Sequence, residues 1–421
     1  MRVLVSAYAC EPGAGSEPAV GWNWVREVAE FCEVWVLTRG NNREAIESSL
    51  EGVPKNAHFV YLDLPTWLRF WKKGRRGVHG YYCLWQVLAY FVAKRLHRRV
   101  AFDLVHQLTL GSSWLPTFLW LLPAPLVWGP IGIGSPSPRG YRGEFSFRGR
   151  LSERLRGFVG TVMRFEPVHR AAEDRAAVIL ATSPGTLRSF DEPLRRKVVL
   201  FPQVGLDPTE IAARALHERS GLRLISVGRL VHWKGVSLGV KAFAKLRERS
   251  GDCEYWIVGE GPEGARLRRL AASLGVANSV RFVGAVSRSD YLQLVAESDV
   301  LLHLSVHEPG AFTIVEAMAM GRPVVCMDLG EPSLLVTPET GFRIRASESR
   351  DAIDQMADVC EMLARDRSSC RRMGVAARER AVALFSWRRK ARQMRRFYEL
   401  AVREDQRDAD RTRMDARGSS L

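Results

Sequence analysis

Two glutamates eight residues apart are the side chains whose spacing most directly indicates a chemistry. Glu308 is followed by Pro309 and Gly310, which disfavour a helix at this point. Residues 312–320 contain Glu316 and have the apolar pattern of a buried helix. Carboxylates at both ends of such a segment can bind hydroxyl groups, and the free N–H groups at a helix N-terminus favour an anion. A ligand with an anionic centre and hydroxyls at both ends is a nucleotide-diphosphate sugar.

Another interpretation of the two glutamates remains open at this point. Glu308 could simply favour the helix dipole, and Glu316 could be a solvated surface residue. However, the neighbours of Glu316 are Val315, Ala317 and Met318, among which an unpaired carboxylate would be costly.

A second pair of charged residues follows the apolar segment 222–227, which we expect to form a buried parallel strand. Arg229 comes directly after Gly228, and Lys234 lies five residues further on. Open α/β sheets bind ligands at the carboxyl ends of their strands, so these cations are placed where a diphosphate would bind. They could neutralise the diphosphate and the charge that grows on it as a sugar leaves. For either residue alone, a surface cation in a basic protein is the alternative.

These motifs occur in an order that resembles family 4 of the GT-B glycosyltransferases, also described as glycosyl transferases group 1. The resemblance rests on Gly228-Arg229…Lys234-Gly235 and on Glu308…Glu316, and it is strongest over residues 220–345. It also includes the segments 256–262, 280–284, 296–300 and 321–325. The ordered set is specific, although no single motif is.

The resemblance implies a retaining, metal-independent transfer of a sugar from a nucleotide-diphosphate donor, without a cofactor. Arg229 and Lys234 would hold the diphosphate leaving group. Glu316 would bind the ribose hydroxyls, and Glu308 the hydroxyls of the donor sugar. The backbone around the sugar and diphosphate would come from Pro309, Gly310, Ala311 and Phe312.

Two glycine-rich turns are further candidates for the donor site. Gly13 and Gly15 follow the first predicted strand, where glycine lets backbone N–H groups approach a phosphate. Pro18 occupies the position of the third glycine of a dinucleotide fingerprint, so NAD is not expected, and a plain tight turn is the alternative. Gly259 opens a GxGxxG segment, but the two glutamates within it would repel a pyrophosphate. In the family, this turn lines the nucleotide pocket.

His106 ends a predicted strand of the first half and is a candidate catalytic residue. Family members often carry His-x-His here, and the second histidine is implicated near the reacting sugar. In this chain the second position is Leu108, so a structural or acceptor-orienting role for His106 is also open. No histidine or cysteine spacing predicts a metal site, and the DxD match at Asp408-Ala409-Asp410 lies in a tail that is not expected to hold a metal.

Strands and helices alternate through both halves of the chain, which predicts an α/β fold with two doubly wound parallel sheets. The resemblance implies two Rossmann-like domains facing each other across a cleft, with the C-terminal helix crossing back to the first. We expect an acceptor-side domain over residues 1–203, joined by residues 387–402, and a nucleotide-sugar-binding domain over residues 204–386. Residues 404–421 are polar and are expected to form a disordered tail.

Composition narrows the partners and the compartment. The chain has 421 residues and a net charge of +16, so an anionic partner is expected. Seven scattered cysteines favour a reducing cytosol, and we expect neither a signal peptide nor a membrane-spanning segment. The segments 67–99 and 139–156 interleave aromatic residues with cations, including Lys72, Lys73, Arg75 and Arg76, which suits an anionic membrane surface. Helices that pack on the first sheet are the alternative.

The sequence therefore predicts a cytoplasmic enzyme, peripheral on the inner face of the membrane, with a lipid-linked or polysaccharide acceptor. Nucleic acid is not expected, because no nucleic-acid fold signature accompanies the basic segments. Two other functions remain open: a non-catalytic protein that binds nucleotide sugar, and a nucleotide-sugar epimerase of the same fold.

Overall fold

The computed structural model describes residues 1–421 except 50–51, 69–70, 72–76, 113–114, 133–136, 164–166, 210, 212–220, 308–309 and 419–421. For residues 160, 161, 163 and 407–418 it describes the backbone only. The chain forms two compact units. Unit 1 comprises Met1–Gly134, Gly160–Gln203 and Trp387–Leu421, and unit 2 comprises Ser135–Val159 and Val204–Ser386.

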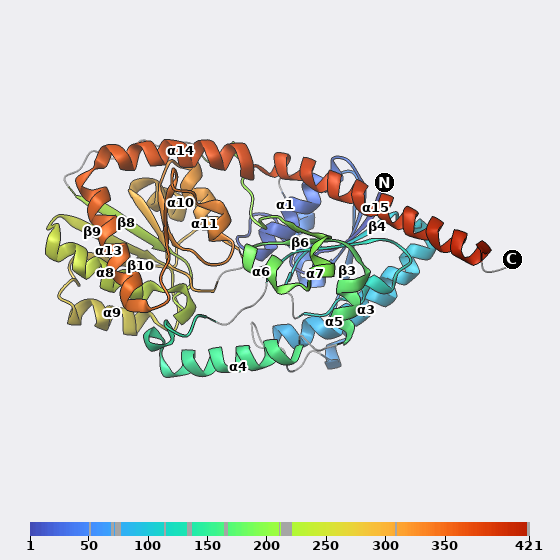
Figure 1. The fold of residues 1–421 in the computed structure, drawn as a ribbon, viewed down its shortest axis with the longest axis horizontal. Coiled ribbons are helices and arrows are strands. Elements are labelled where there is room, and N and C mark those ends of the chain that lie inside the picture. The colour runs from blue at the N-terminus through green and yellow to red at the C-terminus, as the bar shows by residue number, and fades with distance from the viewer. Residues whose placement is uncertain are drawn as a thin grey trace. The chain divides into compact units, whose positions relative to one another are not determined.

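Unit 1 is built on a seven-stranded parallel sheet in the order β3-β2-β1-β4-β5-β6-β7 (Figure 1). Its strands are β1 (Arg2–Ser6), β2 (Glu33–Arg39), β3 (Ala57–Leu62), β4 (Leu104–Gln107), β5 (Leu126–Ile131), β6 (Ala176–Ala181) and β7 (Val198–Leu200). Its helices are α1 (Glu17–Ala29), α2 (Arg43–Glu47), α3 (Val78–Val100), α5 (Pro167–Arg175), α6 (Pro184–Ser189), α7 (Glu192–Arg195) and α15 (Trp387–Gly418). Strands β1, β4 and β5 are almost entirely buried, as expected for a parallel sheet that is covered on both faces.

The C-terminal helix α15 belongs to unit 1, where it contacts α1, β4, β5 and β6. The rings of Trp387 and Trp24 lie 5.4 Å apart, and the Lys390 ammonium donates a hydrogen bond to the carbonyl of Pro202. Our prediction of a disordered tail over residues 404–421 differs from this helix, which extends to Gly418. Residues 404–413 contain no proline or glycine and repeatedly place an acidic residue three positions before an arginine, a spacing that stabilises helices.

Unit 2 contains a six-stranded parallel sheet in the order β10-β9-β8-β11-β12-β13. Its strands are β8 (Leu222–Val227), β9 (Cys253–Val258), β10 (Val280–Gly284), β11 (Val300–His303), β12 (Val324–Met327) and β13 (Gly341–Ile344). Its helices are α8 (Val236–Arg249), α9 (Gly264–Ser273), α10 (Arg288–Glu297), α11 (Phe312–Ala319), α12 (Pro332–Leu335), α13 (Ser349–Arg365) and α14 (Arg367–Phe385).

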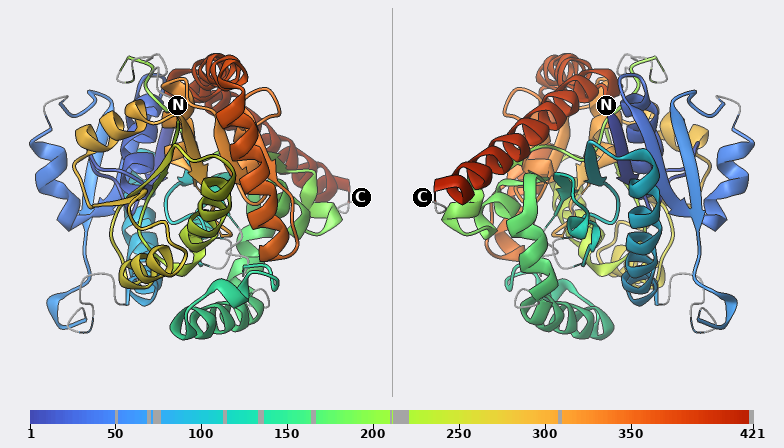
Figure 2. Two further views of the ribbon diagram at one scale, coloured as in Figure 1. Left: turned by 90° about the vertical axis from the view of Figure 1, so that its left-hand side faces the viewer. Right: turned by 90° about the vertical axis from the view of Figure 1, so that its right-hand side faces the viewer.

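Alternate residues of β8, β9, β11 and β12 enter two different cores. Leu224 packs in one cluster with residues of α8, α9 and α13, whereas Ile225 packs in another with residues of α10, α11 and α14. Helices α8 and α13, which pack in the cluster of Leu224, lie side by side (Figure 2). The two cores hold the sheet rigidly, so that the loops at its carboxyl edge start from fixed positions.

One segment that the sequence places in the first domain belongs to unit 2 in the structure. We expect residues 1–203 to form one domain, but residues 135–159 pack with unit 2. The Tyr141 hydroxyl donates to the carbonyl of Ala346 over 2.7 Å, and the Ser146 hydroxyl donates to Glu263 over 2.8 Å. Lys241 of α8 forms an ion pair of 2.8 Å with the mostly buried Glu144. Helix α4 (Phe147–Met163) begins in this segment and crosses the boundary between the units.

Helix α3, in the segment 67–99, packs one face into the core of unit 1 and leaves Leu84, Val87 and Phe91 exposed. Tyr81, Tyr82 and Trp85 of α3 are buried, so these aromatic side chains do not form a surface. Trp67 is 70% exposed, but the four cations Lys72, Lys73, Arg75 and Arg76 lie outside the described residues. Within the part of the chain that the structure describes, no helix is long and apolar enough to span a membrane.

Candidate functional site

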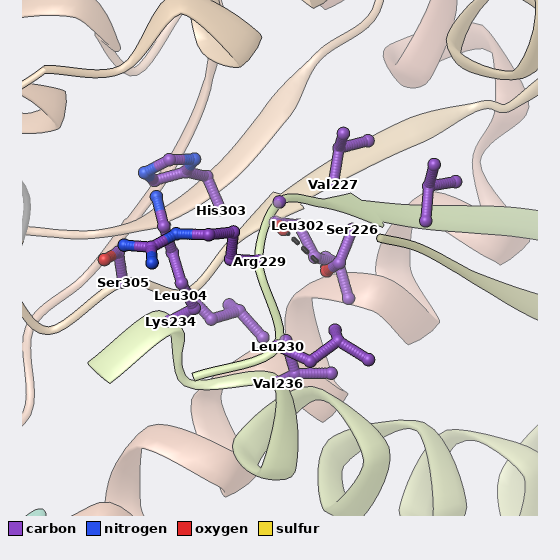
Figure 3. Close-up of a pocket in the computed structure, with 12 residues that line it drawn as sticks. Ser226, Val227, Arg229, Leu230, Lys234, Val236, Leu302, His303, Leu304 and Ser305 are labelled. Atoms are coloured by element: carbon purple, nitrogen blue, oxygen red, sulfur yellow. Dashed lines mark hydrogen bonds between the residues drawn. The ribbon is translucent and has the colours of Figure 1, made fainter. Parts of the chain in front are cut away.

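A pocket opens where the strand order of the unit 2 sheet reverses. The chain proceeds outward from β8 through β9 and β10, and then returns to place β11 on the other side of β8. Connections leave β8 and β11 in opposite directions at such a switch point, and a crevice remains between them. The pocket is lined by Ser226, Val227, Gly228, Arg229, Leu230, Lys234, Val236, Val258, Leu302, His303, Leu304 and Ser305 (Figure 3).

The two predicted cations line this pocket together. Arg229 follows β8 directly, and Lys234 ends the short 3₁₀ segment η5 (His232–Lys234). The loop is tied to the end of β11, because the Trp233 carbonyl accepts hydrogen bonds from the backbone N–H of Val306 (2.9 Å) and the hydroxyl of Ser305 (3.2 Å). The charged ends of Arg229 and Lys234 point to the same side of the pocket as the ring of His303 (Figure 3). The arrangement is suited to an anion.

His303 adds an imidazole to the pocket without adding charge. It ends β11, and its Nδ1 lies 3.2 Å from the hydroxyl of Thr313 on α11. Burial and the positive charge of Lys234 lower the pKa of His303 to about 3. The ring is therefore neutral at physiological pH. His303 was not predicted to belong to the site, because a lone histidine at a strand end has no distinctive spacing.

Gly259 is required by the close approach of two loops. A side chain at position 259 would meet the carbonyl oxygen of Gly228 at 2.1 Å, and its φ of +127° lies in the region that favours glycine. The Gly228 N–H donates to the Val258 carbonyl over 3.0 Å, which fixes the end of β8 against that of β9. Gly259 thus holds the wall of the pocket, although it is not a lining residue itself.

Glu316 is buried on α11 and already has two partners within unit 2. It is 3% exposed, and Arg288 donates to its Oε1 over 2.6 Å. The hydroxyl of Tyr291 donates to its Oε2, and burial together with this carboxylate raises the pKa of Tyr291 well above the usual value. These contacts explain how a carboxylate is tolerated in the apolar sequence around it. Arg288 and Tyr291 were missed in the sequence, because only the folded chain brings α10 against α11.

The remaining residues of the second motif lie at the start of the same helix. Ala311 precedes α11 and is buried, Phe312 is its first residue, and Gly310 lies in the preceding loop. Glu308 and Pro309 lie outside the described residues, so their predicted contacts stay predictions.

Helix α4 contacts the loop that carries Arg229 and Lys234, through His232. Its Glu153 is fully buried and accepts hydrogen bonds from His232 (3.2 Å) and from the backbone N–H of Ser137 (2.9 Å). Burial opposes the charge of Glu153, but these hydrogen bonds and the nearby Arg156 lower its pKa to about 2. A side chain at Gly149 would meet the His232 ring at 2.8 Å, so glycine permits this contact. No pattern in the sequence indicates this contact, since Glu153 and His232 are 79 residues apart.

His106 has a structural environment in unit 1. Its Nδ1 lies 2.6 Å from the hydroxyl of Tyr398 on α15, and its Nε2 lies 2.7 Å from the carbonyl oxygen of Gly129. A carbonyl can only accept, so Nε2 carries the proton and Nδ1 accepts from the tyrosine. Both nitrogens are thus used within the fold, and burial lowers the pKa of His106 to about 4. This environment favours the structural alternative, in which His106 fastens α15 to the sheet, and the catalytic assignment stays a prediction.

Gly13 and Gly15 lie between β1 and α1 in unit 1 and do not line the pocket of unit 2. Next to them, the Glu17 carboxylate accepts hydrogen bonds from the Leu110 N–H (2.6 Å) and from Gln203 (2.9 Å). Leu108, at the position of the family's second histidine, is buried. Among the described residues, no group of three or more histidine, cysteine or acidic side chains could hold a metal ion.

Comparisons with known proteins agree with this geometry. A family model described as glycosyl transferases group 1 matches residues 209–380. The chain is 30% identical over 314 residues to the MMP alpha-(1->4)-mannosyltransferase of Mycolicibacterium hassiacum, and the match covers 72% of each chain. It is also 30% identical over 162 residues to the alpha-D-kanosaminyltransferase of Streptomyces kanamyceticus, covering 37% of this chain and 42% of that one. The chain spans less than two thirds of the length of several such curated relatives.

A solved structure of sucrose-phosphate synthase from Thermosynechococcus elongatus superimposes with a TM-score of 0.66 at 21% identity, over 94% of this chain and 98% of that one. Two parallel α/β sheets of this kind define the GT-B class of fold. The chain belongs to the glycosyl transferases group 1 family, which confirms the resemblance of its motifs.

The neutral His106 makes the stability of the protein depend on pH. Between about pH 4 and 6.5 an unfolded histidine binds a proton that the folded His106 does not. The contribution of the neutral His106 to the free energy of unfolding is therefore fully present above pH 6.5 and is lost as the pH falls from there towards 4. From pH 7 to pH 5 we expect this one residue to lower the free energy of unfolding by about 2 kcal/mol. Chemical unfolding of the wild type and of His106→Gln at both pH values measures it, and the variant should lose this part of the pH dependence.

Tyr398→Phe is the control, because it removes the hydroxyl bonded to His106 but keeps the imidazole. It should cost about 1 kcal/mol at both pH values and retain the pH dependence. If the wild type and His106→Gln respond equally to pH, the assignment of a buried, neutral His106 is wrong.

Proposed function

We propose that the protein transfers a sugar from a nucleotide-diphosphate donor to an acceptor, with the donor diphosphate bound in the pocket of unit 2. The observation that carries the proposal is that Arg229 and Lys234 line one pocket at the switch point of the sheet. Two cations and a neutral imidazole at that point form a site for an anion with hydroxyl groups attached. Family membership supports the same reaction class.

In the proposed reaction, Arg229 and Lys234 bind the diphosphate and stabilise the negative charge that develops on it as the bond to the sugar breaks. Fixed charges of this kind act more strongly in a site that excludes water than they would in solvent. The N-terminus of α11 adds its backbone N–H groups beside the same anion. His303 can donate a hydrogen bond from its neutral ring without competing with the two cations for the charge of the ligand.

We propose that Glu316 binds the ribose of the donor. Its carboxylate is held in place by Arg288 and Tyr291, so it is oriented before the nucleotide arrives. A carboxylate accepts up to about four hydrogen bonds, which leaves acceptor sites for two hydroxyl groups. Glu308 would bind the hydroxyls of the sugar, in line with the family resemblance.

Three finer parts of the proposal rest on the resemblance. The transfer would retain the anomeric configuration, and it would need no metal, because Arg229 and Lys234 supply the positive charge for the leaving group. The acceptor would be lipid-linked or a growing polysaccharide, bound by the first unit. The enzyme would then act in the cytoplasm at the inner face of the membrane, to which a chain of net charge +16 is attracted.

The direct test is to incubate the pure protein with labelled nucleotide sugars and membrane lipids, and to follow the label. Arg229→Ala and Lys234→Ala should each lower the turnover about 100-fold, because each removes charge stabilisation from the leaving diphosphate. Arg249→Ala removes a cation that lies on α8 and pairs with Asp358, and it is the matched control. Wild-type turnover in both pocket variants would contradict the proposal, and label moved within the donor alone would indicate an epimerase.

The two glutamates can be separated by calorimetry. Glu316→Gln keeps the shape of the buried side chain but removes its charge, and we expect it to weaken the binding of free UDP or GDP by about tenfold or more. Glu308→Ala should spare the free nucleotide and weaken the nucleotide sugar only. Glu254→Gln is the control for loss of a carboxylate, because Glu254 is exposed on β9 and pairs with Arg223. If Glu316→Gln and Glu308→Ala both bind both ligands as the wild type does, the assignment of the two glutamates is wrong.

A further inference from the structure

Helix α4 carries a row of apolar side chains that the described parts of the chain do not cover. Phe147, Leu151, Leu155 and Phe158 are 74%, 58%, 62% and 68% exposed. Their spacings of four, four and three residues place them on one face of the helix. At about 100° per residue they span an arc of about 80°. We call these four residues the α4 apolar row.

Exposed arginines border the α4 apolar row along both of its edges. Arg148 lies at one edge, and Arg150 and Arg154 lie at the other, on a helical wheel of α4. The opposite face of the helix carries Gly149 and Glu153, which are buried against the loop of His232. The helix thus has one face that packs within unit 2 and one face that presents apolar groups between cations.

We propose that the α4 apolar row and its flanking arginines bind an anionic membrane surface, with α4 lying in the interface. An apolar face bordered by arginines is the pattern by which helices insert side chains among acyl chains while their cations contact anionic headgroups. This inference deepens the proposed membrane association by naming the surface. It does not depend on the donor site, because binding to lipid can be measured without sugar transfer.

Charge favours lipid over a second copy of the chain as the occupant. Two α4 apolar rows packed against each other would bring Arg148, Arg150 and Arg154 of both copies together, and like charges repel. Single-stranded nucleic acid is disfavoured for another reason, because the middle of the row is formed by Leu151 and Leu155, on which bases do not stack.

The position of α4 also relates the membrane to the donor site. Glu153, on the buried face of the helix, hydrogen-bonds His232 in the loop that carries Arg229 and Lys234. The same helix would therefore contact the membrane with one face and the loop of Arg229 and Lys234 with the other. A lipid-linked acceptor suits an enzyme that is fixed to the surface in this way.

Co-sedimentation of the full chain with lipid vesicles tests the inference. The wild type should bind vesicles that contain phosphatidylglycerol, bind pure phosphatidylcholine much less, and dissociate as salt is raised. Leu151→Gln with Leu155→Gln should weaken binding by about tenfold or more, because the exposed apolar groups are lost. Arg150→Glu with Arg154→Glu should weaken binding to the anionic vesicles similarly. Val375→Gln is the matched control, since Val375 is 60% exposed on α14 and lies outside the row.

The inference is overturned if the wild type ignores anionic vesicles at low salt, or if the two row variants bind as well as the wild type. If the row variants bind normally but Trp67→Gln does not, the membrane-binding surface lies in the segment 67–99 instead. Sedimentation velocity adds a third outcome. A wild-type dimer that Leu151→Gln with Leu155→Gln dissociates, without vesicle binding, would make a second copy the occupant. Transfer to a soluble acceptor should persist in the row variants, which separates this test from that of the donor site.

Discussion

The structure of unit 2 depends on one constraint: two cations must line the same pocket at the carboxyl edge of a sheet. Arg229 and Lys234 come from one short loop after β8, so their charges would separate if that loop were free. The loop is held by the Trp233 carbonyl bonded to the end of β11, and by the contact of Gly228 with Gly259. His303 adds no third charge, because its pKa is lowered to about 3. A preformed concentration of positive charge results, which is what a leaving diphosphate requires.

The segment 137–159 shows how a neighbouring part of the sequence can support a site in another unit. It leaves the first sheet after β5 and packs on the second, where Tyr141 and Phe145 enter the core of α8 and α9. Its helix α4 then fixes His232 through a hydrogen bond to the buried carboxylate of Glu153. A buried carboxylate without such partners would be strongly destabilising, so Glu153 and the loop define each other's positions. The same helix leaves its opposite face apolar and exposed, which joins the support of the site to the proposed contact with lipid.

Short-range patterns in the chain predict local features of the fold, whereas contacts between distant elements leave no such pattern. The alternation of strands and helices predicts both sheets, since parallel strands are continuous apolar runs. The pocket around Gly228, Arg229 and Lys234 could be predicted because all three lie in one loop after a recognisable strand. Arg288, Tyr291 and Glu153 could not, because each meets the site through packing between distant elements. His106 was ambiguous for the same reason, because its partner Tyr398 is 292 residues away and only the folded chain shows that contact.

A crystal structure of the protein with a bound nucleoside diphosphate would test the account most directly. The account predicts that the phosphate oxygens lie within hydrogen-bond distance of Arg229 and Lys234, and that the ribose hydroxyls contact Glu316. A nucleotide bound instead at the carboxyl edge of the unit 1 sheet, beside Gly13 and Gly15, would contradict it.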